Sequence, residues 1–345
     1  MTRLSVNPIM VFMENKEQKS LYIVDIIRCT ACLMIFLYHC NTILPGEFRF
    51  LTFFGEDMGN DLFFLISGFA LLPSIERAEL KDFPRWYLRR LIRILPTLAF
   101  FYLLSFLTGF YALKDPAQLF TVFIYPTLYW FVTGILIFYI LVFLIFKLFP
   151  GAIRLLIPLL LLILWWILWD KMETYYLSGL LSMLTGALLR ESLEKGSFLS
   201  RKTPLYPAAF FISFILYMAV KGLKFTGAAA SMGILRPVSL SAGILAIASG
   251  CFALIWGYEE NAALSLFFES RTPLIKIIRK TGLLALSVYM VQCFNAGLIG
   301  FKIGEKIPFP LSFAVNLVVI WGAAILTDLI FGKLSRMMSP KDRTT

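Results

Sequence analysis

Apolar residues in this 345-residue chain come in long continuous blocks, and this pattern restricts the possible folds more than any other feature. Each block can cross a hydrocarbon core of about 30 Å, which requires about 20 residues at a rise of about 1.5 Å per residue. The blocks are rich in Leu, Ile and Phe and lack the alternation of membrane-barrel strands. Because backbone groups in lipid must be paired within the protein, the sequence predicts helices.

The predicted fold class is therefore an all-α, polytopic membrane helix bundle. Hydrophobic residues make up 59% of the chain and charged residues 15%, with mean hydropathy +0.80, which excludes a water-soluble globular protein. The polar stretches at 76–93, 190–204 and 258–282 are too short for a soluble domain. We predict about ten transmembrane helices, near residues 21–44, 60–75, 94–112, 129–149, 152–169, 175–189, 205–221, 234–257, 283–301 and 311–332.

The basic residues of the chain are distributed as expected for the loops of a membrane protein. The net charge is +11, but the basic residues lie in short loops beside apolar blocks, so no nucleic-acid partner is expected. With the N-terminus inside, 24 of the 32 lysines and arginines fall on the inner side. This bias predicts a multi-pass protein of the cytoplasmic membrane, surrounded by lipids, with a cytoplasmic N-terminal segment at 1–20 and a cytoplasmic tail at 333–345.

The cysteines give little support for a metal site. Cys29 and Cys32 have C-x-x-C spacing, but the chain has one histidine and no second cysteine pair of this kind. All five cysteines fall in or beside apolar segments, where we interpret them as small residues for helix packing. We therefore predict neither a metal site nor a disulfide framework.

The predicted span at 21–44 carries Asp25, Arg28 and His39. Charged groups inside a membrane are costly, so each is a candidate functional residue. At about 100° per residue, Arg28 and His39 lie on one helix face, about 16 Å apart along the axis. The structural alternative is that Arg28 reaches the inner headgroups and pairs with Asp25, while His39 bonds a carbonyl group.

The next span begins from the outer side with Gly59-Asn60-Asp61-Leu62-Phe63-Phe64-Leu65-Ile66-Ser67-Gly68-Phe69. This direction places Asp61 at the depth of His39. The carboxylate is either an N-cap of the helix or a group that orients the imidazole and stabilises its charged form, and the two roles are compatible. Ser67 and Gly68 are also typical of close helix packing.

The inner segment at 77–93 holds six basic residues and continues into Ile94-Leu95-Pro96. These residues need no ligand to act as topology determinants. Arg90 and Arg93, however, share a helix face by their i,i+3 spacing, and guanidinium groups suit bidentate phosphate binding. A phosphate-bearing donor at the inner face would fit this pair.

Three motifs now stand in order: Arg-x10-His ending at His39, Asp-x-Phe-Phe-x-x-Ser-Gly-Phe from Asp61, and Arg-x-x-Arg-Ile-x-Pro from Arg90. In this order and spacing the chain resembles membrane acyltransferase family 3, the O-acyltransferases that modify surface polysaccharides and other glycans. The resemblance covers essentially the whole chain, including Trp130-Phe131 at the fourth span, and implies a transmembrane acyltransferase domain at 21–332.

The resemblance implies a donor and an acceptor. The donor is cytoplasmic acyl-CoA, most often acetyl-CoA, which is a substrate and not a permanently bound cofactor. The acceptor is a hydroxyl of a sugar or a lipid-linked glycan. It also implies that Arg28, Arg90 and Arg93 bind CoA phosphates, that His39 is the base and that Asp61 orients it. Direct transfer and an acyl-histidine intermediate both fit these residues.

One late motif departs from the family pattern. Family members often carry Tyr-Leu-x-His in a late helix, whereas this chain has Tyr289-Met290-Val291-Gln292. Gln292 can donate and accept hydrogen bonds but cannot titrate, so His39 is left as the one possible imidazole base. We assign Tyr289 and Gln292, with Asp25 and Ser67, to supporting roles.

Two other functions fit a bundle with buried charges. One is a transporter or flippase for a lipid-linked or acylated glycan, which predicts no dependence on CoA. The paired, interrupted helices that are typical of transporters are not visible in the sequence. The other is a catalytically inactive scaffold in glycan assembly, against which the presence of His39, Arg28, Asp61 and the arginine pair argues.

Overall fold

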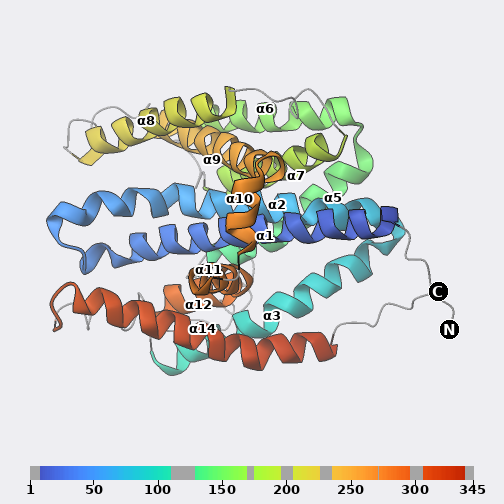
Figure 1. Ribbon diagram of the computed structural model, residues 1–345. Coiled ribbons are helices and arrows are strands. Elements are labelled where there is room, and N and C mark those ends of the chain that lie inside the picture. Colours follow the sequence, from blue (N-terminus) through green and yellow to red (C-terminus); the bar gives the residue numbers. More distant parts are fainter. Residues whose placement is uncertain are drawn as a thin grey trace.

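The computed structural model describes residues 8–109, 129–168, 175–195, 205–225, 235–270, 272–295 and 306–338. These ranges contain helices and no strands (Figure 1). The helices are α1 (Pro8–His39), α2 (Asn60–Arg77), α3 (Phe83–Leu107), α5 (Trp130–Leu148), α6 (Gly151–Leu168), α7 (Tyr175–Lys195), α8 (Leu205–Phe225), α9 (Leu235–Glu260), α10 (Ala262–Glu269), α11 (Pro273–Leu283), α12 (Ala285–Asn295) and α14 (Leu311–Met338). Short helical turns are η1 (Cys40–Thr42), η2 (Gly46–Thr52), η3 (Gly55–Gly59) and η4 (Leu80–Asp82).

The predicted all-α membrane bundle is confirmed. In the described ranges, 8 segments are long and apolar enough to cross a membrane: Tyr22–Thr42, Gly46–Arg77, Leu80–Leu107, Trp130–Leu148, Gly151–Leu168, Leu205–Leu223, Leu235–Glu260 and Leu311–Lys333. The location of both termini on the inner side stays a prediction.

The sequence predicted two spans beyond these. The first, 175–189, corresponds to α7, which is less apolar because it carries Ser178, Ser182 and a charged C-terminal end. The second, 283–301, begins in α12, and its part from residue 296 onward lies outside the described residues. The predicted count of about ten therefore exceeds the 8 segments that meet the criterion of length and apolar character.

Helix α2 lies in the interior of the bundle and crosses α7 at very short distance. A Cβ atom built on Gly68 would lie 1.9 Å from the carbonyl oxygen of Met183, and one on Gly186 would lie 1.8 Å from that of Leu65. Such an approach is open to glycine alone, as in other membrane helix pairs that pack through small residues. This contact fixes the position of α2, and with it the side chains that α2 directs toward α3.

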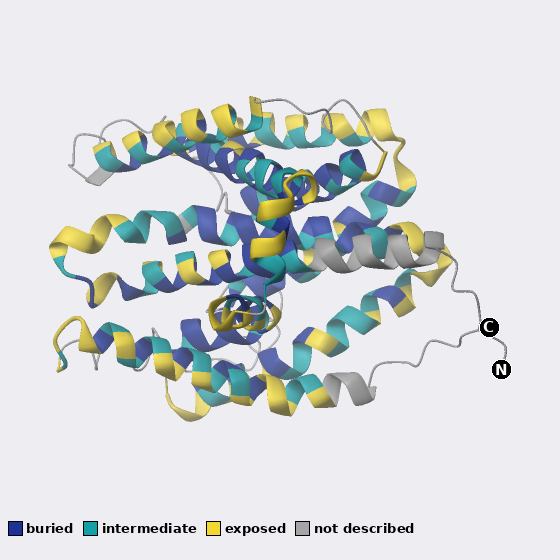
Figure 2. Cartoon of the chain, viewed as in Figure 1, coloured by how far each residue is buried: buried dark blue, intermediate teal, exposed yellow. Residues whose placement is uncertain are grey.

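The outer helices expose apolar side chains. On α6 the exposed residues include Leu155, Leu156, Leu159, Leu160, Ile163 and Ile167. Figure 2 shows the same contrast across the bundle, with buried residues in the middle and exposed ones along the outer helices. An apolar outer face is what a protein surrounded by lipid tails requires, so the exposed leucines need no protein partner.

The predicted N-cap role of Asp61 is not what the structure has. The cap position of α2 is Gly59, and no side chain caps this helix. The chain is already helical in η3 before α2 begins, so the first backbone N–H groups of α2 are not left for a carboxylate to satisfy.

Candidate active site: an arginine-lined cavity

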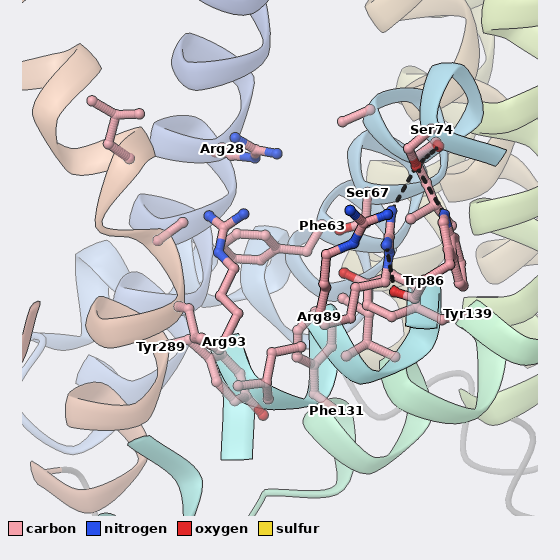
Figure 3. A pocket seen from close by; sticks show the side chains of 18 of the residues that line it. Arg28, Phe63, Ser67, Ser74, Trp86, Arg89, Arg93, Phe131, Tyr139 and Tyr289 are labelled. Carbon is pink, nitrogen blue, oxygen red and sulfur yellow. Dashed lines mark hydrogen bonds between the residues drawn. The ribbon is translucent and has the colours of Figure 1, made fainter. Parts of the chain in front are cut away.

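A cavity of about 770 Å³ lies between α1, α2, α3, α5 and the junction of α11 with α12 (Figure 3). Its lining includes six arginines, Arg28, Arg77, Arg85, Arg89, Arg90 and Arg93. Among the described residues that line it, Asp82 is the one carboxylate. The cavity is therefore strongly cationic and suits an anionic ligand.

The structure brings together five of the residues singled out by sequence. Arg28, Ser67, Arg90, Arg93 and Tyr289 all line the cavity. Asp25, His39, Asp61 and Gln292 are not among its lining residues. Sequence reasoning counted Arg77, Arg85 and Arg89 as topology determinants only; their signal was the density of basic residues between positions 77 and 93.

Arg28 forms the predicted pair with Asp25. Its Nη1 donates to Asp25 Oδ1 at 3.2 Å, and the Asp25 side chain is buried. A Cβ on Gly282 would lie 2.0 Å from the Asp25 carbonyl oxygen, so the end of α11 packs directly on the α1 backbone here. Figure 3 shows Arg28 from α1 and Arg93 from α3 reaching into the same space.

Arg90 is held on several sides. Its Nη1 donates to the Trp86 carbonyl at 2.8 Å and its Nη2 to Ser74 Oγ at 2.6 Å. Its guanidinium lies 3.6 Å from the centroid of the Trp86 ring and 5.9 Å from that of Tyr139. Cation–π contacts and hydrogen bonds together fix the direction of this group.

Aromatic rings form another part of the lining. Phe131 of α5 lies with its ring centroid 5.7 Å from that of Phe63 and 4.8 Å from that of Tyr289. Phe63, Phe131 and Tyr289 are buried. The cavity thus combines guanidinium groups for anions with an apolar surface for an uncharged part of a ligand.

The structure does not join His39 to Asp61. His39 ends α1, and its Nδ1 is buried without a hydrogen-bond partner in the described part of the chain. Asp61 is buried and has Ser178 and Ser182 of α7 as its polar neighbours. No hydrogen bond between the His39 ring and the Asp61 carboxylate occurs among these described side chains. The close α2–α7 crossing turns this face of α2 toward α7.

Gln292 contacts α1 between Arg28 and His39. Its Nε2 donates to the carbonyl oxygen of Cys32 at 3.0 Å, and the side chain is 1% exposed. Cys32 lies one turn beyond Arg28 on the way to His39. Gln292 therefore links α12 to the α1 backbone.

The arrangement has clear chemical possibilities. Six guanidinium groups around one space can bind several phosphate oxygens, with the strength of charge-assisted hydrogen bonds. In the described ranges, no group of three or more His, Cys, Asp or Glu side chains could hold a metal ion. Fold and cavity together define a multi-pass helical membrane protein with a cationic cavity that suits an anionic ligand.

The family comparison is consistent with this class of protein. The model of the acyltransferase domain of acyltransferase family 3 matches residues 21–328, nearly the whole chain. The chain belongs to this family and is an integral membrane acyltransferase. Neither curated proteins nor solved structures gave a significant match. The resemblance inferred from the three sequence motifs is confirmed.

Proposed function

We propose that this protein is an O-acyltransferase of the cytoplasmic membrane that moves an acyl group, most often acetyl, from acyl-CoA to a hydroxyl of a sugar. The acceptor is a surface polysaccharide or a lipid-linked glycan. The observation that carries the proposal is the cavity in which Arg28, Arg90 and Arg93 meet three further arginines.

CoA fits the chemistry of this cavity. It carries three phosphate groups at one end and an uncharged thioester arm at the other, and the lining offers guanidinium groups together with Phe63, Phe131 and Tyr289. The volume of about 770 Å³ lies within the range of pockets that enclose molecules of moderate size. In this proposal the arginine cluster faces the cytoplasm, where acyl-CoA is supplied.

His39 is the proposed base. It takes the proton of the acceptor hydroxyl as the oxygen attacks the thioester carbonyl; the C–S bond breaks and the CoA thiolate leaves and is protonated. The extended donor arm covers much of the distance of about 16 Å between Arg28 and His39. Asp61 lies against Ser178 and Ser182 of α7 and has no hydrogen bond to His39 in the described ranges, so the proposal assigns the proton transfer to His39 alone.

The test is release of CoA thiol from acetyl-CoA by the purified, detergent-solubilised protein with a panel of glycan acceptors. All five cysteines of the chain are buried, so their own reaction with a thiol reagent is slow. Arg93→Gln probes phosphate binding because Arg93 is exposed and its guanidinium bonds no described residue. Arg49→Gln, at an exposed arginine of η2 outside the cavity, is the control for lost charge.

We expect Arg93→Gln to raise KM for acetyl-CoA about tenfold with little change in kcat, since one charge-assisted hydrogen bond is lost. His39→Ala should lower kcat by about 10² to 10⁴. Acceptor-dependent release that survives in His39→Ala refutes His39 as the base. No release with any acceptor favours the transporter or flippase reading.

A further inference from the structure

We infer that Ser74 is a positioning residue of the donor site, which fixes the Arg90 guanidinium toward the cavity. This inference rests on the proposed function. Ser74 lies in the last turns of α2, after Pro73, and faces the first turns of α3. Its Oγ accepts hydrogen bonds from Arg90 Nη2 at 2.6 Å and from Trp86 Nε1 at 3.3 Å.

The hydrogen-bonding capacity of Ser74 is fully used within the protein. A hydroxyl has one proton to donate and two lone pairs that accept. Ser74 donates its proton to the Leu71 carbonyl at 2.6 Å, and its two acceptor positions serve Arg90 and Trp86. Ser74 lines the cavity but has no bond left for a ligand. It therefore acts on a donor through Arg90.

Arg90 keeps enough donors for a phosphate. A guanidinium has five N–H groups in a rigid fork. Of these, one goes to the Trp86 carbonyl and one to Ser74 among the described residues. The remaining N–H groups exceed the two that a bidentate phosphate contact needs. A guanidinium already fixed in its binding direction loses less conformational freedom on binding than a mobile one.

Arg93 provides the contrast. By its i,i+3 spacing it is equivalent to Arg90 in the sequence, yet its side chain is exposed and bonds none of the described residues. Ser74 contacts Arg90 and not Arg93. The structure therefore separates a fixed arginine from an unrestrained one, and Ser74 is the side chain that hydrogen-bonds the fixed one among the described residues.

The test compares binding of CoA itself to the purified, solubilised protein by calorimetry, together with KM and kcat for acetyl-CoA. Ser74→Ala and Ser74→Cys remove or weaken the acceptor, and Ser74→Thr keeps it. Ser249→Ala is the matched control, because among the described residues the buried Ser249 hydroxyl bonds carbonyls of its own helix α9 alone, those of Leu245 and Ala246.

We expect Ser74→Ala and Ser74→Cys to weaken CoA binding about tenfold and to raise KM with kcat nearly unchanged. Ser74→Thr and Ser249→Ala should stay within about twofold of the wild type. In an Arg90→Lys background, Ser74→Ala should have little further effect on CoA binding, because the residue that it positions is gone.

The outcomes separate the two proposals. If the wild type binds CoA and either Ser74→Ala or Ser74→Cys binds it equally well, the positioning role is overturned while the proposed function stands. The positioning role is also overturned if Ser74→Ala lowers CoA affinity equally with and without Arg90→Lys. If the wild type binds no CoA, both proposals fall. Should Ser74→Ala fail to fold, Ser74→Cys, which keeps the side-chain shape, decides the question.

Discussion

Replacing Gly68 by alanine should force α2 and α7 apart. The added Cβ would lie 1.9 Å from the carbonyl oxygen of Met183 and 2.8 Å from its carbonyl carbon. Ordinary van der Waals contact begins at 3.4 Å, so the two backbones must separate by more than about 1 Å. Rotation of a side chain cannot relieve this clash, because the two nearest contacted atoms belong to the Met183 backbone.

The expected change in the free energy of unfolding follows from two opposing contributions. Overpacking in a core costs about 1 to 3 kcal/mol, and the rigid neighbour here places the cost at the upper end. Alanine in place of a helical glycine contributes about 1 kcal/mol in the favourable direction. We therefore expect Gly68→Ala to lower the free energy of unfolding by about 2 kcal/mol, which is more than a tenfold change in the folded-to-unfolded ratio.

The assay is thermal unfolding in detergent with a thiol-reactive fluorophore, since all five cysteines are buried and react when the bundle opens. Gly322→Ala on α14 is the control, because a Cβ there meets nothing within 4 Å. It should leave the melting temperature unchanged or raised. A Gly68→Ala protein that melts at or above the wild-type temperature would refute the reasoning. Adding Gly186→Ala should cost less than the sum, because the helices are already separated.

Ion pairs at three acidic residues yield further predictions that the same thermal assay checks. Lys221 Nζ lies 2.6 Å from Asp57 Oδ2, and the Lys221 side chain is 5% exposed, against 27% for that of Asp57. Asp57→Asn should therefore lower the free energy of unfolding by about 3 kcal/mol, and by more than Lys221→Met. Equal effects of the two substitutions would contradict this expectation. Glu191 accepts from Arg154 at 2.7 Å and also from Lys195, so Glu191→Gln should cost about 3 kcal/mol, whereas Glu194→Gln, at a more exposed pair, should cost less than about 1 kcal/mol. A larger loss from Glu194→Gln would refute the second expectation.

The helices of the bundle were predictable because apolar blocks in lipid leave few alternatives. The span predicted at 205–221 begins at the first residue of α8 (Leu205–Phe225) and ends within this helix. The polar stretch at 258–282 was not recognised as helical, although Asn261 caps α10 and Thr272 caps α11 in the structure. Caps are weak signals when the helices that they begin are short and partly charged.

Helix α3 shows a second limit of the apolar pattern. It begins at Phe83, whereas the predicted span began at residue 94. Because the turns that hold Arg85 and Arg89 are charged, a search for apolar spans leaves them outside the helix. The helix continues through them, with Pro84 in its first turn, and this continuation carries the arginines to the cavity.

The site was predictable where it depends on spacing along one helix, and not where it depends on how helices cross. The i,i+3 spacing predicted Arg90 and Arg93 as a phosphate-binding pair, the family resemblance added Arg28, and all three line the cavity. The contact of Ser74 with Arg90 depends on the packing of α2 against α3, about which periodicity in either helix says nothing.

The wall of the cavity that Gly282 and Tyr289 complete belongs to α11 and α12, which are made late in synthesis. Until this part of the chain is made, the cavity that holds Arg28 and Arg90 lacks its α11–α12 side. A chain interrupted before position 282 keeps all six guanidinium groups but lacks this wall, and charge-assisted contacts weaken in water. Completion of the cavity therefore depends on the last part of the chain, so a chain interrupted before position 282 should bind an anionic ligand less tightly than the full-length protein.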